Sequence, residues 1–211
     1  MGVTQRAVAR RNGEEIGGYL DLRWHELLAE LGGQALQIPP VTRAAIALVE
    51  ATRPQAIVFS GGNDLARLTG ATDAFPQRDA MEAALLKLVE KERVPLVGIC
   101  RGAQFIARSF AAELALAADH AGTRHEILPV TEDDTFPAGL HVGSYHRWAI
   151  RSVGLPDALV PVARAPDGTI EAFRVAQRAV WGFMWHPERE TQRSVGREVF
   201  IRTLRCALCM Q

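Results

Sequence analysis

Through the first half of the chain, short runs of apolar, often β-branched residues alternate with longer segments of helical periodicity. Strands are predicted at residues 2–8, 35–38, 55–59 and 95–99, and helices at residues 19–31, 42–51, 78–92 and 101–116. A strand, a helix and a second strand in succession form a right-handed crossover, which makes the two strands parallel. Helices then cover both faces of the sheet. The sequence therefore predicts an α/β fold with a mainly parallel sheet.

The second half of the chain has a different pattern, in which turns rich in Pro, Gly and Asp connect shorter strands. Strands are predicted at residues 126–130, 139–150, 158–163, 169–175 and 179–185, followed by a final helix at residues 191–208. Short turns of this kind favour antiparallel neighbours. We find neither a repeat nor a linker, so we interpret residues 1–211 as a single domain with a partly antiparallel C-terminal section.

Composition narrows the classes of partner. A chain of 211 residues with 48% hydrophobic side chains can bury a sizeable core without a disulfide or a metal. The 24 Lys and Arg residues balance the 24 Asp and Glu residues, so the basic excess of a nucleic-acid-binding protein is missing. There is no apolar run of membrane-spanning length and no leader-like N-terminus, and the three cysteines do not suggest a disulfide framework. We expect a cytoplasmic protein with no nucleic-acid or membrane partner.

Cys100 stands at the end of an apolar strand, and a helix is predicted to begin at the next residue. Gly98 and Gly102 lie two residues to either side, a layout that is typical of a nucleophile elbow. The N-terminal end of a helix stabilises the thiolate, which is the nucleophilic form of cysteine. The alternative is a buried cysteine that only fills space, so the interpretation depends on finding a base.

A second apolar strand, at residues 179–185, delivers a histidine and a carboxylate at its end. His186 is of the residue type that activates a thiol, and a third group must hold its ring in the right tautomer. Glu188 can do this, and Pro187 fixes the chain between the two. A lone histidine would be weak evidence, but it gains weight beside the strand, cysteine and helix around Cys100.

An acyl-transfer site also needs N–H donors for the developing oxyanion. We expect the backbone N–H of Arg101 to be one donor, because this residue begins the predicted helix. The turn at Gly61 and Gly62 follows the preceding parallel strand and can supply a second. Both turns would lie at the carboxyl ends of parallel strands, where ligands bind in open α/β sheets.

Two stretches now carry a family pattern: Gly-Ile-Cys-Arg-Gly-Ala-Gln at residues 98–104 and Trp-His-Pro-Glu at residues 185–188. They closely resemble the class I glutamine amidotransferases and their γ-glutamyl hydrolase relatives, over nearly the whole chain. The resemblance implies a flavodoxin-like fold, no cofactor and no metal. It implies that Cys100 is the nucleophile that forms a glutamyl thioester, His186 the general base and Glu188 the orienting acid. The residues that it places near a γ-glutamyl substrate are Asn63, Gln104, Tyr145, His146, Arg147 and Trp148.

Other stretches, at residues 4–6, 60–66, 167–174 and 188–190, look like the γ-glutamyl-CDP-amidate hydrolases of capsule phosphoramidate biosynthesis. The segment at residues 143–146 departs from that pattern, because Gly143 stands where an asparagine is expected. This resemblance implies a cytidine nucleotide conjugate as the substrate, and its phosphates need cations. The arginines from which we expect these cations to come are Arg6, Arg23, Arg78, Arg101 and Arg124.

Three further groups of residues are weaker candidates. Cys206 and Cys209 have the spacing of a redox or metal pair, but they fall in the final predicted helix without a second pair. His120 and His125 are interpreted as loop histidines, because the sequence offers no third metal ligand beside them. Two adjacent acids, Asp133 and Asp134, are interpreted as solvated turn residues.

Three other functions stay open at this point. One is a hydrolase of the γ-glutamyl-γ-aminobutyrate type, and another is a glutaminase subunit that delivers ammonia to a separate synthetase. The third is a non-catalytic binding protein that kept the fold, which does not require a nucleophile, a base and an orienting acid together. A homo-oligomer is also compatible with the sequence.

Overall fold

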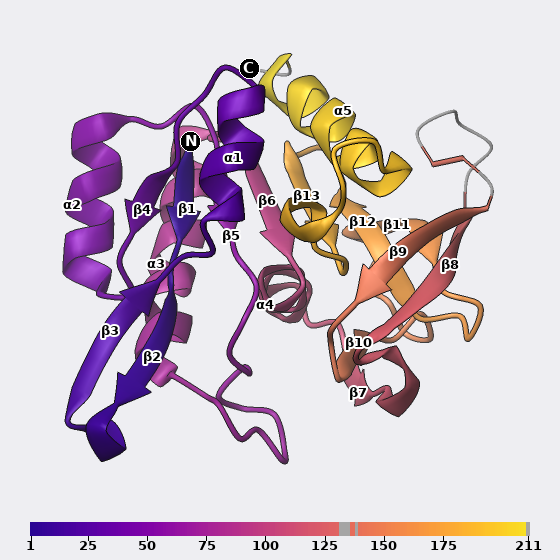
Figure 1. Ribbon diagram of the computed structural model, residues 1–211, viewed down its shortest axis with the longest axis horizontal. Coiled ribbons are helices and arrows are strands. Elements are labelled where there is room, and N and C mark those ends of the chain that lie inside the picture. The colour runs from indigo at the N-terminus through magenta and orange to yellow at the C-terminus, as the bar shows by residue number, and fades with distance from the viewer. Residues whose placement is uncertain (131–135, 138, 210–211) are drawn as a thin grey trace.

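The computed structural model describes residues 1–130, 136–137 and 139–209. Five parallel strands lie side by side in the first part of its large sheet (Figure 1). In spatial order they are β4 (Leu36–Ile38), β1 (Gly2–Thr4), β5 (Ile57–Phe59), β6 (Leu96–Ile99) and β13 (Val180–Phe183). The strand β13 comes from the far end of the chain, so it brings residues 184–188 beside the end of β6.

Helices cover both faces of this sheet, as predicted (Figure 1). Ile57 and Phe59 of β5 pack on one side, in the apolar cluster that includes α2 (Thr42–Thr52), α3 (Pro76–Glu92) and α4 (Arg101–Ser109). The intervening Val58 packs on the other side with α1 (Arg23–Glu30) and α5 (Val195–Cys209). Successive side chains of a strand point to opposite faces, so a short strand made only of apolar residues contributes side chains to the apolar cluster on each face of the sheet.

The antiparallel section is also present. From β13 the sheet continues through β12 (Ile170–Val175), β11 (Leu159–Arg164), β8 (Thr123–Pro129) and β9 (Leu140–Ser144). Each of these strands is antiparallel to its neighbour. A short strand β10 (Trp148–Ile150) pairs with both β12 and β7 (Leu114–Leu116). The single helical turn η2 (Ala118–His120) lies between β7 and β8, and η3 (Pro187–Arg189) lies between β13 and α5. The predicted α/β architecture is therefore confirmed.

The N-terminal prediction was wrong in two respects. The strand predicted at residues 2–8 ends at Thr4, and a separate hairpin follows, made of β2 (Arg6–Arg10), η1 (Arg11–Gly13) and β3 (Glu15–Tyr19). The helix predicted to begin at Tyr19 begins at Arg23, because Tyr19 pairs with Arg6 in that hairpin. The strand β2 is anchored at Ala7, because the side-chain amide of Asn63 both donates to and accepts from the main chain of that residue.

Two other predicted elements are divided in the structure. The helix predicted at residues 101–116 ends at Ser109. Ala111 has a positive φ of 67°, a conformation in which a right-handed helix cannot continue. The following residues form β7. The strand predicted at residues 139–150 is interrupted between Ser144 and Trp148. Within the described residues, no helix is both long and apolar enough to cross a membrane.

Candidate active site

Cys100 joins β6 to α4 and has an unusual backbone conformation, with φ of 51° and ψ of −107°. Its N–H donates to the carbonyl oxygen of Phe183 on β13 (2.7 Å), and its own carbonyl oxygen accepts from the N–H of Gln104 (3.0 Å). The side chain is 7% exposed. A non-glycine residue held at such a φ stores strain, and strain of this kind is concentrated at functional sites.

The two glycines beside Cys100 are required by close packing. A Cβ atom on Gly98 would lie 2.6 Å from the backbone nitrogen of Ala103, inside the turn itself. A Cβ atom on Gly102 would overlap the carbonyl group of Phe59 on the adjacent strand β5. Any side chain at either position would push α4 away from the sheet. The glycine pattern seen in the sequence therefore follows from the tight entry of the chain into α4.

His186 and Glu188 reach the same place from β13. Residue Phe183 is in register with Ile99, so the two strands end together. Nδ1–H of His186 donates to Oε1 of Glu188 at 2.6 Å, and both side chains are almost fully buried. A Cβ atom on Gly61 would lie 2.5 Å from Cε1 of His186 and 3.5 Å from Cβ of Cys100, so the glycine turn lies against both residues. The structure thus brings the three predicted catalytic residues together.

The charge of His186 is set by its neighbours. Burial by itself lowers the pKa of this imidazole, but the charges of Glu188 and of the Cys100 thiolate raise the pKa to about 10. A hydrogen bond with each of them adds to the rise. The imidazole is therefore held as a cation beside the sulfur, in the arrangement that stabilises a thiolate nucleophile.

The glycine turn after β5 is held by Arg78, which is fully buried. Its Nη2 donates to the carbonyl oxygen of Ser60 (2.6 Å), and its Nη1 donates to those of Gly61 (3.2 Å) and Gly62 (2.5 Å). In a trans peptide the N–H points opposite to the C=O. The N–H groups that follow these carbonyls are therefore turned away from Arg78.

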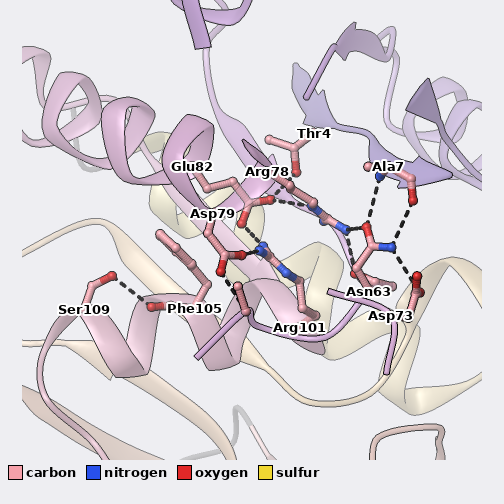
Figure 2. Close-up of polar contacts among 12 residues, drawn as sticks. Thr4, Ala7, Asn63, Asp73, Arg78, Asp79, Glu82, Arg101, Phe105 and Ser109 are labelled. Atoms are coloured by element: carbon pink, nitrogen blue, oxygen red, sulfur yellow. Dashed lines mark hydrogen bonds and ion pairs between the residues drawn. The ribbon is translucent and has the colours of Figure 1, made fainter. Parts of the chain in front are cut away.

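A buried ion-pair network surrounds this guanidinium (Figure 2). Nε of Arg78 donates to Oε1 of Glu82 at 3.1 Å, and Oε1 also accepts from the hydroxyl of Thr4 at 3.0 Å. The guanidinium of Arg101 pairs with both Glu82 and Asp79. Both guanidiniums are thus paired with protein groups, which favours a structural role for Arg78 and Arg101 over the phosphate contact that was expected of them. Buried charges are tolerated here because they are paired.

A cavity of about 270 Å³ opens beside the thiol. All six predicted substrate-binding residues line it. Nε2 of Gln104 donates to the carbonyl oxygen of Trp148 at 2.8 Å, which ties α4 to the wall. The ring of Tyr145 stands edge-on to His186, with ring centres 5.5 Å apart. The complete lining is Arg6, Gly62, Asn63, Asp64, Asp73, Cys100, Arg101, Gln104, Tyr145, His146, Arg147, Trp148, His186 and Arg189.

Comparison with known proteins agrees with this geometry. Residues 2–188 match the peptidase C26 family, and this span includes Cys100, His186 and Glu188. The chain belongs to the peptidase C26 family. It is 31% identical over 190 residues to the γ-glutamyl-CDP-amidate hydrolase of Campylobacter jejuni, which is 90% of each chain. It is 28% identical over 175 residues to one subunit of the glutamine-hydrolysing GMP synthase of Thermococcus kodakarensis, covering 82% of this chain and 85% of the relative.

Solved structures show the same fold. A candidate GMP synthase subunit from Thermoplasma acidophilum superposes with a TM-score of 0.70 over 100% of this chain and 94% of its own, at 21% identity. A glutamine amidotransferase from Thermotoga maritima superposes with a TM-score of 0.63 over 99% and 84%, at 17% identity. The predicted resemblance to class I glutamine amidotransferases is thus confirmed. The family and these relatives place the chain among γ-glutamyl amide hydrolases and glutamine amidotransferases.

Some of the predicted substrate-binding residues form hydrogen bonds or ion pairs with other residues of the chain. The amide of Asn63 bonds with the main chain of Ala7, with Asp73 and with Arg78, so it holds the hairpin in place. Arg147 donates to Oδ2 of Asp64 at 3.0 Å across the cavity mouth. The ring nitrogens of His146 face the carbonyl oxygen of Trp148 and the carboxylate of Glu171, so this ring forms part of the wall through its packing.

Of the arginines from which phosphate contacts were expected, Arg6 and Arg101 line the cavity at Cys100, and Arg147 and Arg189 line it as well. Arg6 lies 4.7 Å from the centre of the Tyr19 ring, and Arg189 lies 4.9 Å from that of Tyr145. Both line the cavity at Cys100 and also a smaller space that is lined by Ser60, Gly61 and Gly62. Arg23 and Arg124 are not among the described residues that line either space. The sequence pattern missed Arg189, although it directly follows Glu188.

The three groups of weaker candidates from the sequence have different outcomes in the structure. Cys206 and Cys209 are exposed on the terminal helix α5. Asp133 and Asp134 lie outside the described residues. The interpretation of His120 and His125 as loop histidines without a third ligand is wrong, because His146 and Glu171 join them in a tight group.

Proposed function

We propose that this peptidase C26 chain hydrolyses a γ-glutamyl amide through a glutamyl thioester on Cys100. One observation carries the proposal: a strained cysteine at the start of a helix shares a cavity with a buried histidine that a carboxylate orients at 2.6 Å. The catalytic roles are those of nucleophile for Cys100, acid and base for His186, and orienting acid for Glu188.

In the first half-reaction, the Cys100 thiolate attacks the γ-carbonyl carbon and forms a C–S bond. The negative charge that develops on the oxygen is stabilised by the N–H of Arg101 and by N–H groups of the turn at Gly61 and Gly62. The imidazolium of His186 gives its proton to the leaving nitrogen as the C–N bond breaks. Water then attacks the thioester while neutral His186 accepts a proton, the C–S bond breaks, and glutamate leaves.

The glutamyl group would occupy the cavity between Gln104, Tyr145 and the wall at Arg147 and Trp148. Arg147 is half-exposed at the mouth, where it can meet the α-carboxylate of the substrate. Asp64 and Asp73 line the same space and can meet the α-ammonium group. A γ-linked amide presents both of these groups, so this pocket would reject the α-linked isomer.

For the leaving group, we propose an anionic nucleotide conjugate of the CDP-amidate type. Arg6 and Arg189 are the arginines among the described residues that line both the thiol cavity and the smaller space at the glycine turn. Nε of Arg6 is buried without a hydrogen-bond partner among the described residues, so this side chain has unused donor capacity. The Campylobacter jejuni relative, a γ-glutamyl-CDP-amidate hydrolase, supports the same choice. A γ-aminobutyrate leaving group is the runner-up.

The second candidate function is that of a glutaminase subunit that supplies ammonia to a separate synthetase. It is favoured by the likeness to the Thermococcus kodakarensis GMP synthase subunit, which the chain matches over 85% of that subunit's length. In that case the substrate is glutamine, and hydrolysis depends on a partner protein.

The proposals separate in one kinetic experiment. We would measure kcat/KM for γ-glutamyl-CDP-amidate, γ-glutamyl-γ-aminobutyrate and glutamine, each at low and moderate salt, with Cys100→Ala as the blank. We expect the nucleotide conjugate to be preferred, with an advantage that salt reduces because Arg–phosphate attraction is screened. A preference for γ-glutamyl-γ-aminobutyrate would reject the nucleotide. Negligible turnover of all three by the isolated chain would reject an independent hydrolase in favour of the partnered glutaminase.

A further inference from the structure

Four side chains that can bind a metal meet on the side of the molecule that carries the antiparallel strands. They are His120 at the end of η2, His125 on β8, His146 just after β9, and Glu171 on β12. One ligand atom from each lies within 4.8 Å of the ligand atoms of the other three. None of the four is among the catalytic residues proposed above, so a role for this group does not depend on that function.

The distances converge on one carboxylate oxygen. Oε1 of Glu171 lies 3.4 Å from Nδ1 of His120, 3.6 Å from Nε2 of His125 and 3.4 Å from Nε2 of His146. The side chain of Glu171 is 0% exposed, and those of His120 and His146 are 8% and 1% exposed. These three nitrogens and both oxygens of Glu171 have no hydrogen-bond partner among the described residues.

The opposite side of each imidazole explains what these nitrogens can do. Nε2 of His120 faces Oδ2 of Asp167 at 3.0 Å, and Nδ1 of His125 faces the carbonyl oxygen of Glu126 at 3.0 Å. Nδ1 of His146 faces the carbonyl oxygen of Trp148 at 3.1 Å. Carboxylate and carbonyl oxygens accept only, so each of these outer nitrogens carries the proton. In the neutral rings, the inner nitrogens therefore present lone pairs.

In their neutral forms the three rings thus point lone pairs at the buried carboxylate of Glu171. The contact with Glu171 raises the pKa of His120, so the positive charge that this spot requires is either a metal ion or a proton on that ring. Groups of this kind repel one another unless a positive charge lies between them. An imidazole that donates its outer N–H to a carboxylate or carbonyl is the usual arrangement of a metal-ligating histidine. Metal–ligand bonds of about 2.0–2.1 Å in a tetrahedron separate the ligand atoms by about 3.3 Å. The observed separations from Oε1 are close to this value.

The geometry points to a zinc-type metal site with the ligands His120 Nδ1, His125 Nε2, His146 Nε2 and a carboxylate oxygen of Glu171. Imidazole and carboxylate ligands in a four-coordinate group suit Zn²⁺ and Co²⁺. Four protein ligands fill a tetrahedron and leave no open position for a substrate, so the metal is structural. It joins η2, β8 and β12 to the segment between β9 and β10, whose residues Tyr145 and Arg147 line the cavity at Cys100.

The test uses a background in which thiolates cannot compete for the metal. The chain has three cysteines, so Cys100, Cys206 and Cys209 are all replaced by Ser. This protein is purified from zinc-supplemented culture, and its metal content is measured by mass spectrometry. We expect about one zinc per chain. In the same background, His125→Gln should lose most of the metal. His125 is the most exposed of the four ligands, at 16%, so its replacement is the mildest.

His141→Gln is the matched control. His141 lies on β9 of the same hairpin and pairs with Glu126, but its ring is exposed and outside the group. This variant should keep its zinc. Retention of metal by His125→Gln, or equal loss from both variants, would overturn the proposed ligand set.

A second measurement covers the case in which His125→Gln does not fold. The protein with all three cysteines replaced by Ser and all histidines native is stripped of metal with a chelator and titrated with Co²⁺. Cobalt absorbs visible light intensely in a tetrahedral site and only weakly in an octahedral one. We expect a stoichiometric tetrahedral spectrum and a rise in Tm when Zn²⁺ is restored. A Tm that neither chelator nor zinc changes, with no tetrahedral band, would show that a proton on one histidine balances Glu171 instead.

Discussion

Cys100 has a backbone conformation that an L-residue adopts only under constraint, with φ of 51°. Strain of this kind costs roughly 1–3 kcal/mol, whereas glycine pays no such penalty but loses about 0.5–1 kcal/mol of chain entropy. We therefore predict that Cys100→Gly has a free energy of unfolding about 1 kcal/mol above that of Cys100→Ala, measured by urea denaturation. Both variants should be inactive, because each lacks the thiol.

A matched pair at an unstrained cysteine serves as the control. Cys206 lies in the last turn of α5, where a helical backbone still favours alanine over glycine. Cys206→Gly should therefore be less stable than Cys206→Ala by about 0.5–1 kcal/mol, the reverse of the order at position 100. The same order at both positions would contradict a strained nucleophile. Activity above a trace in Cys100→Ala would contradict the role of the thiol.

The charge of Glu188 should determine the alkaline limit of activity. In the proposed mechanism His186 acts as an acid only while it is protonated, and its pKa of about 10 places the fall of kcat/KM near that pH. Glu188→Gln removes a negative charge that raises this pKa, so the imidazolium is lost at a lower pH. We predict that the alkaline limb moves down by at least about one pH unit. Glu190→Gln is the control, since Glu190 bonds to Gly143 and Arg124 instead.

An unchanged alkaline limb in Glu188→Gln would show that Glu188 does not govern the protonation of His186. We also expect Glu188→Gln to be less damaging to kcat than Cys100→Ala. The imidazole stays in place and can still hydrogen-bond to the Gln side chain, whereas nothing replaces the sulfur.

Among the connecting elements, the glycine turn after β5 depends on one guanidinium. Lysine at position 78 keeps the charge but cannot bond Ser60, Gly61, Gly62 and Glu82 together, because it lacks the planar fork. We predict that Arg78→Lys lowers kcat by about 10- to 100-fold with little change in KM, since small displacements of positioned groups cost this much. Stopped-time assays across a substrate range would measure both constants.

Arg23→Lys is the control for this substitution, because Arg23 is half-exposed and pairs only loosely with Asp21 at 3.7 Å. It should leave both constants unchanged. If Arg78→Lys instead raised KM with kcat intact, Arg78 would act on substrate binding and not on the donors of the turn.

The elements that the sequence predicted well are those that a local pattern encodes. The apolar runs of β5 and β6 and the glycines around Cys100 fix their own conformations within a few residues. The hairpin β2–β3 was missed because Gly17 and Gly18 weaken the strand pattern of β3, whose five residues are all exposed. Helix α4 was predicted too long because the apolar residues of β7 continue its pattern.

Across the whole molecule, the sequence could not show which distant side chains meet. His186 was paired with Cys100 through its motif, and the register between β13 and β6 brings the two together. No motif connects His120 with Glu171, which is 51 positions further on. The two meet because β10 pairs with β12, which carries Glu171, and with β7, which leads into the turn that carries His120. The same limit applies to Arg78, since a buried cation and a surface cation look alike in a sequence.

The β2–β3 hairpin has a consequence for how local openings are distributed over the molecule. Among the described strands, β2 and β3 pair only with each other, whereas β1, β5, β6 and β13 are each paired on both sides. Openings that admit solvent to amides occur most easily where such support is thin. Arg6 and Tyr19 adjoin the anchor that Asn63 forms on Ala7, and opening of that anchor would release them without any loss of register around Cys100. In the proposed mechanism, the residues that would meet the leaving group can therefore fluctuate while those that would break the amide bond keep their positions.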